Sequence, residues 1–143
     1  MKIINLAIIS ITLAVASYAF AGQVSPVPVF IVLDEDGSGS AQGDMLTARF
    51  ADNDIEFIGC GTRQFDAGGT IFDFGFCQAG DSEGNRAFCN TDDAELLSAM
   101  RATADYSFVT FSFGANGACT RIGFSTQSFY LPGDVQEKPK KGK

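Results

Sequence analysis

The stretch that decides the fold is residues 55–79, which read IEFIGCGTRQFDAGGTIFDFGFCQA. It contains two runs rich in β-branched and aromatic residues, 55–65 and 70–79, separated by Gly68-Gly69. Such runs are typical of β-strands, and a two-glycine loop suits the primed turns that close β-hairpins. The sequence therefore predicts a long hairpin in the middle of the chain.

The position of the turn also determines which residues of the two strands face each other. A hairpin centred on the two glycines places Phe65 opposite Phe72 and Cys60 opposite Cys77. The cysteines then form a non-hydrogen-bonded pair, in which Cα atoms are about 4.5 Å apart and a disulfide fits. Both cysteines lie on the face of the hairpin opposite the phenylalanines.

Apolar residues recur at the two-residue period of a strand in two places, Phe72/Phe74/Phe76 and Val109/Phe111/Phe113. We expect both stripes to form the packed core, because both follow the strand period and the chain also contains a helix with an apolar face. A ligand-binding groove is the alternative interpretation of the same stripes.

Three segments precede the long hairpin. Residues 29–33 are a continuous apolar run and predict a buried strand. Residues 34–44 are rich in Gly, Ser and Asp and predict a loop, and residues 45–50 predict a second strand.

A second hairpin is predicted near the end of the chain. Asn116-Gly117 is a preferred type I′ turn. A hairpin centred there pairs Val109 with Phe124, Phe111 with Ile122 and Phe113 with Thr120. This register puts the apolar residues of both strands on one face and Cys119 on the other.

Residues 91–103 break the strand pattern and predict a helix. Thr91 or Asp92 can cap its start, and Leu96, Leu97 and Met100 recur on one face. We expect this helix to cover the Phe-rich face of the sheet. The predicted class is α+β, a mainly antiparallel sheet of about six to seven strands with one helix packed on it. A small β-sandwich or barrel with an accessory helix is the alternative.

The start of the chain has the pattern of an export signal. Lys2 precedes an apolar run at 3–17, and residues 19–21, AFA, match the small-x-small motif of signal peptidase sites. We expect residues 1–21 to be a signal peptide and the product to be secreted or periplasmic. Stable membrane insertion after cleavage is not expected.

The remaining chain divides into a body and a tail. Residues 22–133 are expected to form a single globular domain, and residues 134–143 a basic, disordered tail. The body contains five Arg, no Lys and 15 acidic residues, a balance of −10. Such a charge disfavours nucleic acid and anionic lipid as partners, and a protein partner is compatible with it.

The chain has four cysteines and no histidine. In an exported protein four cysteines are typical of two disulfides, and zinc is disfavoured because neither histidine nor a C-x-x-C pair is present. We expect the bonds Cys60–Cys77 and Cys89–Cys119. A loop centred on Glu83 would place Cys77 opposite Cys89 instead, so the connectivity stays open at this point.

Short anchors around the cysteines resemble a group of small exported bacterial proteins of unknown function. The anchors are Ala48-Arg49-Phe50, Ile58-Gly59-Cys60, Cys77, Ala87-Phe88-Cys89-Asn90-Thr91, Tyr106-Ser107-Phe108, Gly117-Ala118-Cys119-Thr120 and Ser128-Phe129-Tyr130-Leu131-Pro132. The likeness covers residues 45–132 and implies a recurring secreted domain with four cysteines. It brings no known catalytic residue.

The acidic stretch 34–45, DEDGSGSAQGDM, begins like a calcium-binding EF-hand loop. The candidate ligands are Asp34, Asp36, Ser38, Ser40 and Asp44. The twelfth position is Met45, where a bidentate Glu is expected, so Asp44 would have to substitute through a different loop path. A solvated acidic hairpin loop is the alternative, and no other cofactor is expected.

Catalytic motifs are not evident. The absence of histidine excludes Ser-His-Asp and Cys-His arrangements, and no Gly-rich phosphate loop precedes the helix. We therefore expect a non-catalytic exported binding protein or accessory envelope protein, with binding residues that the sequence does not indicate. A secreted inhibitor or effector of another protein and a calcium-stabilised module are the alternatives.

Overall fold

The computed structural model describes residues 23–132, so the expected signal at 1–21 and the expected tail at 134–143 lie outside the described residues. The described chain forms seven strands in two antiparallel sheets, together with two α-helices and two disulfides. The predicted α+β class, mainly antiparallel with six to seven strands and disulfide-stabilised, is confirmed, although the strands form two sheets rather than one and a second, short helix is present. Both sheets are open, so the barrel alternative is wrong.

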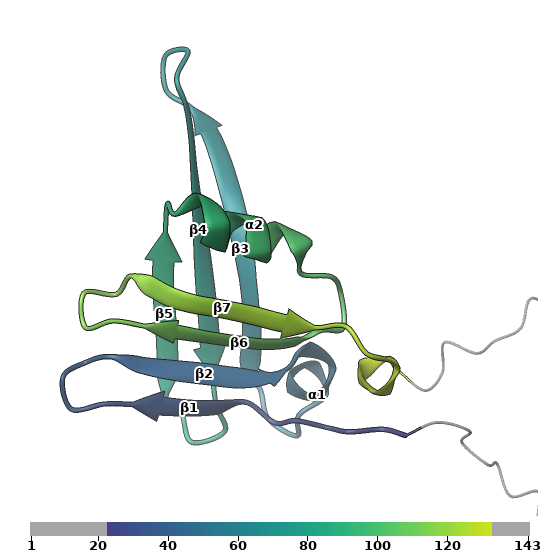
Figure 1. The fold of residues 1–143 in the computed structure, drawn as a ribbon. Helices are drawn as coiled ribbons and strands as arrows, with labels where there is room; N and C mark the ends of the chain where they lie inside the picture. The colour runs from purple at the N-terminus through teal and green to yellow at the C-terminus, as the bar shows by residue number, and fades with distance from the viewer. Residues whose placement is uncertain (1–22, 133–143) are drawn as a thin grey trace, which may run out of the picture.

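One sheet has four strands in the order β1-β2-β6-β7. Their bounds are β1 Phe30–Leu33, β2 Gly39–Asp44, β6 Phe108–Phe113 and β7 Cys119–Ser125. The second sheet, in the order β3-β4-β5, has three strands, β3 Phe57–Asp66, β4 Ile71–Gly80 and β5 Arg86–Thr91. The strands of one sheet run across those of the other (Figure 1), and buried residues from both sheets form one core.

The predicted long hairpin is β3–β4. Phe65 pairs with Phe72 and Cys60 with Cys77, as the two-glycine turn indicates. Gly68 has φ +69° and Gly69 has φ +88°, and these left-handed values favour glycine at both positions. The tip of this hairpin extends well beyond the rest of the molecule (Figure 1).

The segment before the hairpin differs from the prediction. Residues 39–44 form strand β2 rather than a loop, because their glycines permit close approach of backbones. A Cβ on Gly43 would lie 3.0 Å from the Cα of Val29. Residues 45–50 are not a strand either, since Met45–Arg49 forms helix α1, with Asp44 as its N-cap.

Helix α2, Ala94–Ala102, is the helix that the sequence predicts within 91–103. Its N-cap is Asp93, whose side chain accepts hydrogen bonds from the amides of Glu95 and Leu96, so neither Thr91 nor Asp92 is the cap. The buried side of α2 contacts β4 at Gly75, where an added Cβ would lie within 3.0 Å of Leu97 and Met100 side-chain atoms.

The final hairpin contains an irregularity that the sequence pattern does not reveal. Val109 pairs with Phe124 and Phe111 with Ile122, as predicted, but Phe113 pairs with Cys119 because a β-bulge lies between Ser112 and Phe113. The turn is not type I′, since Gly117 has φ +76° while Asn116 has negative φ. The bulge shifts the register by one residue and turns Cys119 into the core, where it is 6 % exposed.

Candidate functional site

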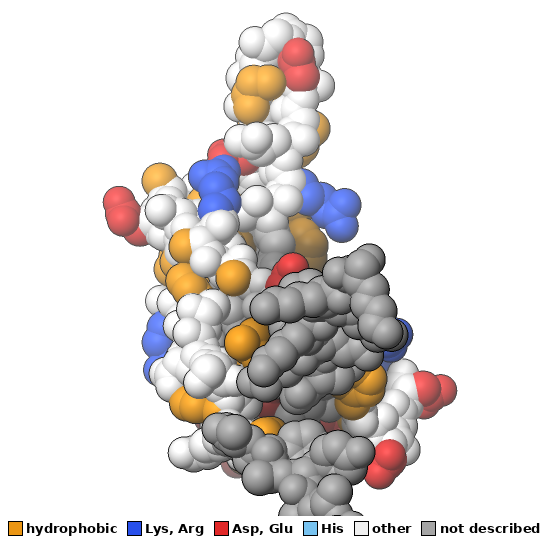
Figure 2. Space-filling view, turned by 90° about the vertical axis from the view of Figure 1, so that its right-hand side faces the viewer, with side chains coloured by type: hydrophobic (Ala, Val, Ile, Leu, Met, Phe, Trp, Pro, Cys, Tyr) orange, Lys and Arg blue, Asp and Glu red, His pale blue; other side chains and the backbone are white. Residues whose placement is uncertain are grey.

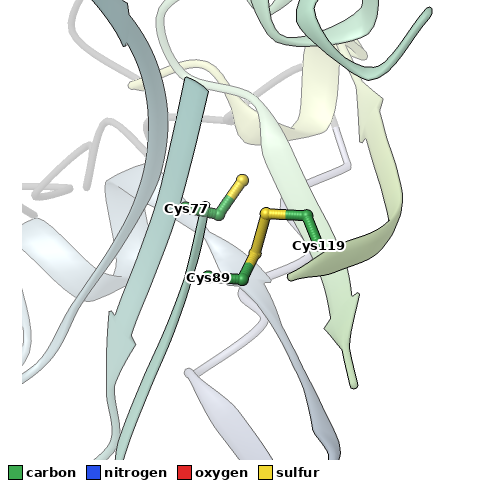
Figure 3. Close-up of side chains that lie close together, drawn as sticks. All are labelled: Cys77, Cys89 and Cys119. Atoms are coloured by element: carbon green, nitrogen blue, oxygen red, sulfur yellow. A yellow bond between two sulfur atoms is a disulfide. The ribbon is translucent and has the colours of Figure 1, made fainter. Parts of the chain in front are cut away.

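The two expected disulfides lie on the side of the three-stranded sheet that faces the core. Cys60 is bonded to Cys77 within the long hairpin, and Cys89 on β5 is bonded to Cys119 on β7 (Figure 3). Cys77 also lies directly opposite Cys89 in the β4–β5 ladder. The two registers left open by the sequence therefore both occur, because β4 is the central strand.

Small residues dominate this inner face. Directly opposed residues of antiparallel strands share a face, and the buried part of the inner face of β4 and β5 consists of Gly75, Cys77, Ala79, Ala87 and Cys89. All five are buried. Their small size lets α2 and the four-stranded sheet approach closely, so the bulky residues of the core come from the opposite sheet, including Val109, Phe111 and Phe113.

The outer face of the three-stranded sheet, which we call the aromatic face, carries six phenylalanines. They are Phe57, Phe65, Phe72, Phe74, Phe76 and Phe88. Phe65 is 51 %, Phe72 48 % and Phe88 55 % exposed, and the other three are partly exposed. The prediction that Phe72, Phe74 and Phe76 form the core and are covered by the helix is therefore wrong. The second stripe, Val109/Phe111/Phe113, is buried as predicted.

Four of the six rings of the aromatic face form a continuous series of contacts. The Phe65 ring stacks on that of Phe72, with centroids 5.6 Å apart, and lies edge-on to Phe74, with centroids 6.4 Å apart. Phe74 and Phe76 are 6.3 Å apart and tilted by 40°. The rings thus present faces and edges alternately, and the surface they form is uneven rather than flat.

Two arginines are the charged residues of the aromatic face, whereas Asp66 and Asp73 lie on the opposite face of the same strands. Arg63 lies over the ring of Phe76, 5.2 Å from its centroid, and Arg86 lies 4.9 Å from the centroid of Phe57. No Asp or Glu shares this face on β3, β4 or β5. Residues 22–133 carry a net charge of −10. On β3, β4 and β5 the aromatic face, unlike the opposite face, combines exposed aromatic rings with positive charge.

The long hairpin extends the aromatic face into solvent. In Figure 2 it stands out from the body, with hydrophobic, acidic and basic side chains exposed along it. Beyond Gly75 the strand β4 has no partner on its β5 side. The backbone of Ile71 to Phe74 is therefore an open sheet edge beside the exposed rings.

The five residues proposed as calcium ligands do not all converge, since only Asp34, Asp36 and Ser38 are joined to one another by hydrogen bonds, through the Ser38 hydroxyl. Asp34, Asp36 and Ser38 lie in the exposed β1–β2 turn, whereas Ser40 is within β2 and Asp44 is buried at its far end. Asp44 lies six positions after Ser38, which corresponds to about 20 Å of extended chain. The five residues therefore do not form one site in this structure, because residues 39–44 are a strand and not a loop.

Asp44 has a structural role instead. It is 1 % exposed, and one carboxylate oxygen accepts a hydrogen bond from the amide of Thr47 at 2.7 Å while the other accepts one from the amide of Val27 at 2.6 Å. The carboxylate thus caps α1 and binds the segment that precedes β1.

The exposed part of the same segment gives a pH-dependent prediction. Hydrogen bonds donated by the Ser38 hydroxyl, and secondly by its amide, hold the pKa of Asp36 below its ordinary value of 3.8. Because a lowered pKa favours the ionised form, this contribution to stability is present above the unfolded-state pKa and is lost as the pH falls through the folded-state pKa. We expect Ser38→Ala to raise the NMR titration midpoint of Asp36. Ser40→Ala should leave it unchanged, and an equal shift in both variants would contradict the assignment.

A shallow depression lies elsewhere, near the end of the described chain. It is lined by Asp105, Tyr106, Thr126, Gln127, Ser128 and Leu131. Tyr106 has φ +59°, a left-handed value that is uncommon for a residue other than glycine. The lining holds a single carboxylate and no arginine or lysine, so its chemistry does not indicate a ligand.

Comparison of the chain with models of known families, with curated proteins and with solved structures gave no significant match. Within residues 23–132, neither helix has the length or the apolar character needed to span a bilayer. The candidate site therefore depends on the geometry of the aromatic face alone.

Proposed function

We propose that this chain is an exported, non-catalytic binding domain that docks a protein partner on its aromatic face. The observation that carries the proposal is the placement of six phenylalanines on the open side of a disulfide-bonded sheet. Exposed apolar side chains that gather in one patch are typical of interaction sites, whereas scattered ones are ordinary.

The size of the face fits the centre of a protein interface. Phe57 to Phe65 spans about 27 Å along β3, and three strands are about 14 Å wide, which gives a patch of about 400 Å². A standard interface buries about 800 Å² on each partner. The aromatic face would therefore supply the apolar centre of such an interface, and neighbouring polar residues such as Gln78 and Asn90 would supply part of the rim.

The composition of the face indicates the chemistry of the partner. Aromatic residues and arginine are enriched in the centres of protein interfaces, where they contribute most of the binding free energy. Arg63 and Arg86 already contact rings and have no carboxylate on their face. The complementary partner surface has an apolar centre and acidic groups placed to meet these two arginines.

Other partner classes fit less well. The tilted rings of Phe65, Phe74 and Phe76 do not form the flat platform on which sugars or bases stack. The negative body repels nucleic acid and anionic lipid. The absence of histidine, and the engagement of all four cysteines in disulfides, support a role without nucleophilic catalysis.

Site-specific photocrosslinking identifies the partner. A photoreactive phenylalanine analogue replaces Phe88 on the aromatic face or Phe30 on β1, because these side chains are similarly exposed, 55 % and 60 %. We expect position 88 to capture a protein that position 30 does not. Capture at both positions, or at neither, would count against the face as the docking surface.

Affinity measurements with the purified, captured protein test the contacts. We expect Phe72→Ser and Arg63→Glu each to weaken binding about tenfold or more, since truncation of a central interface residue costs over 1 kcal/mol. Phe30→Ser should change the Kd less than twofold. If all three variants bind like the wild type, the proposal fails. The proposal also fails if analytical sedimentation shows that the aromatic face joins two copies of this chain. Binding of anionic vesicles to the aromatic face would contradict it as well.

A further inference from the structure

The core brings the two disulfides into contact with each other. Cys60, Cys77 and Cys89 are neighbours across β3, β4 and β5, and Cys119 reaches the same place from β7. The sulfur atoms of Cys77, Cys89 and Cys119 all lie within 4.8 Å of one another. In Figure 3 the sulfur of Cys77 lies beside the bond between Cys89 and Cys119.

The four cysteines differ in their access to solvent. Cys77 and Cys89 are 0 % and Cys119 is 6 % exposed, whereas Cys60 is partly exposed. Since Cys60 is the most exposed of the four residues, its sulfur is the expected point of attack for a thiol in solution. Attack of a thiolate on this sulfur releases Cys77, the member of the bond that lies beside the second disulfide.

We propose that the two disulfides form a thiol-exchange relay, in which reduction at the surface bond is transferred to the bond that joins the two sheets. In the first step an external thiolate forms a bond to the Cys60 sulfur, the Cys60–Cys77 bond breaks, and Cys77 leaves as a thiolate. In the second step Cys77 forms a bond to one sulfur of the Cys89–Cys119 pair. That bond breaks, and the other cysteine leaves as a thiolate, which takes a proton from water.

The electrons balance over the complete reaction. A second external thiol attacks the mixed disulfide on Cys60 and leaves it as a free thiol, so two thiols are oxidised to one external disulfide. The protein gains two electrons and retains one disulfide, which now includes Cys77. The second step is favoured by proximity, because the attacking thiolate and its target are held in one rigid core.

Two single variants give a matched test, since each removes the same bond. In Cys60→Ser the unpaired thiol is Cys77, inside the group of neighbouring sulfurs, and we expect it to exchange until the free thiol is distributed over Cys77 and at least one of Cys89 and Cys119. In Cys77→Ser the unpaired thiol is Cys60, which is not part of that group. It should remain at Cys60. Acid quenching, alkylation and non-reducing peptide mapping locate the thiol.

Limited reduction of the wild-type protein with glutathione provides a second measurement that does not depend on folding of the variants. We expect the species that has lost one disulfide to contain Cys77 bonded to Cys89 or Cys119, with Cys60 alkylated. A species with Cys60 and Cys77 both alkylated and the Cys89–Cys119 bond intact would overturn the relay. So would a Cys60→Ser variant that is alkylated at Cys77 alone.

Discussion

Replacement of Cys89 and Cys119 together by alanine should lower the free energy of unfolding by about 4 kcal/mol. The bond closes a loop with a sequence separation of 30 residues, for which the chain-entropy model gives about 3.5 kcal/mol. The remainder reflects the two sulfur atoms removed from the core, where both residues are buried. The effect is large because this bond is the covalent link between the two sheets.

Urea unfolding under non-reducing conditions measures the loss, with Cys60→Ala/Cys77→Ala as the matched control. The control bond spans 17 residues, which corresponds to about 3 kcal/mol in the same model, and it joins two strands that are already hydrogen-bonded along their length. We expect the smaller loss for this pair. If the variant lacking Cys89 and Cys119 is as stable as the variant lacking Cys60 and Cys77, the disulfide between the sheets contributes no more than the disulfide within the hairpin, and the prediction is wrong.

Asp44→Ala should cost about 3 kcal/mol, the second large effect. The substitution removes the N-cap of α1, worth about 1 kcal/mol, and leaves the amides of Val27 and Thr47 without their acceptor in a place with little access to water. Asp44→Asn retains one acceptor oxygen and should lose about half as much. Asp34→Ala is the control, since this exposed carboxylate accepts only a hydroxyl hydrogen bond, and it should stay within about 0.5 kcal/mol of the wild type.

Thermal melts with calcium and with chelator complete this experiment. Because Asp44 is occupied by backbone amides, we expect the Tm of the wild type to be the same in both conditions. A Tm that rises with calcium and no longer does so in Asp44→Ala would restore the calcium hypothesis. Equal stabilities of Asp44→Ala and Asp34→Ala would show that the buried carboxylate is not a structural anchor.

The long hairpin is the part of the fold that sequence reasoning predicts best. The two glycines at its turn are required by local backbone geometry, and the turn alone sets the opposition of Cys60 to Cys77 and of Phe65 to Phe72. Local chemistry and long-range pairing agree here. The helix at Ala94–Ala102 is predictable for the same reason, since capping and periodicity are local signals.

Strand β2 and helix α1 are not predictable in this way. The glycines of β2 suggest a flexible loop, but they are needed because a side chain on Gly39 would collide with Val32 of β1, and one on Gly43 would crowd Val29 just before that strand. That requirement exists only once the strands are side by side. Likewise, Asp44 begins a helix because its carboxylate is held in the folded core, which no window of neighbouring residues can show.

The sequence contains an indication that the phenylalanines of the aromatic face are exposed, although their hydrophobicity favours burial. Arg63 shares the strand parity of Phe65, and Arg86 shares that of Phe88, so a charge recurs on the phenylalanine side of each outer strand. The alternate parity contains the buried disulfide residue Cys77. Disulfide-bonded cysteines mark the interior face of the hairpin, and this criterion predicts that the phenylalanines lie on the face exposed to solvent.

The inter-sheet disulfide depends on one unpaired residue of β7. Ser112 pairs with Arg121 and Phe113 with Cys119, so Thr120 is the extra residue at the bulge. A regular ladder continued from Ser112 and Arg121 would pair Phe113 with Thr120 and turn Cys119 to the opposite face of the sheet, away from the core in which Cys89 is buried. The bulge is therefore what allows the covalent link between the two sheets to form.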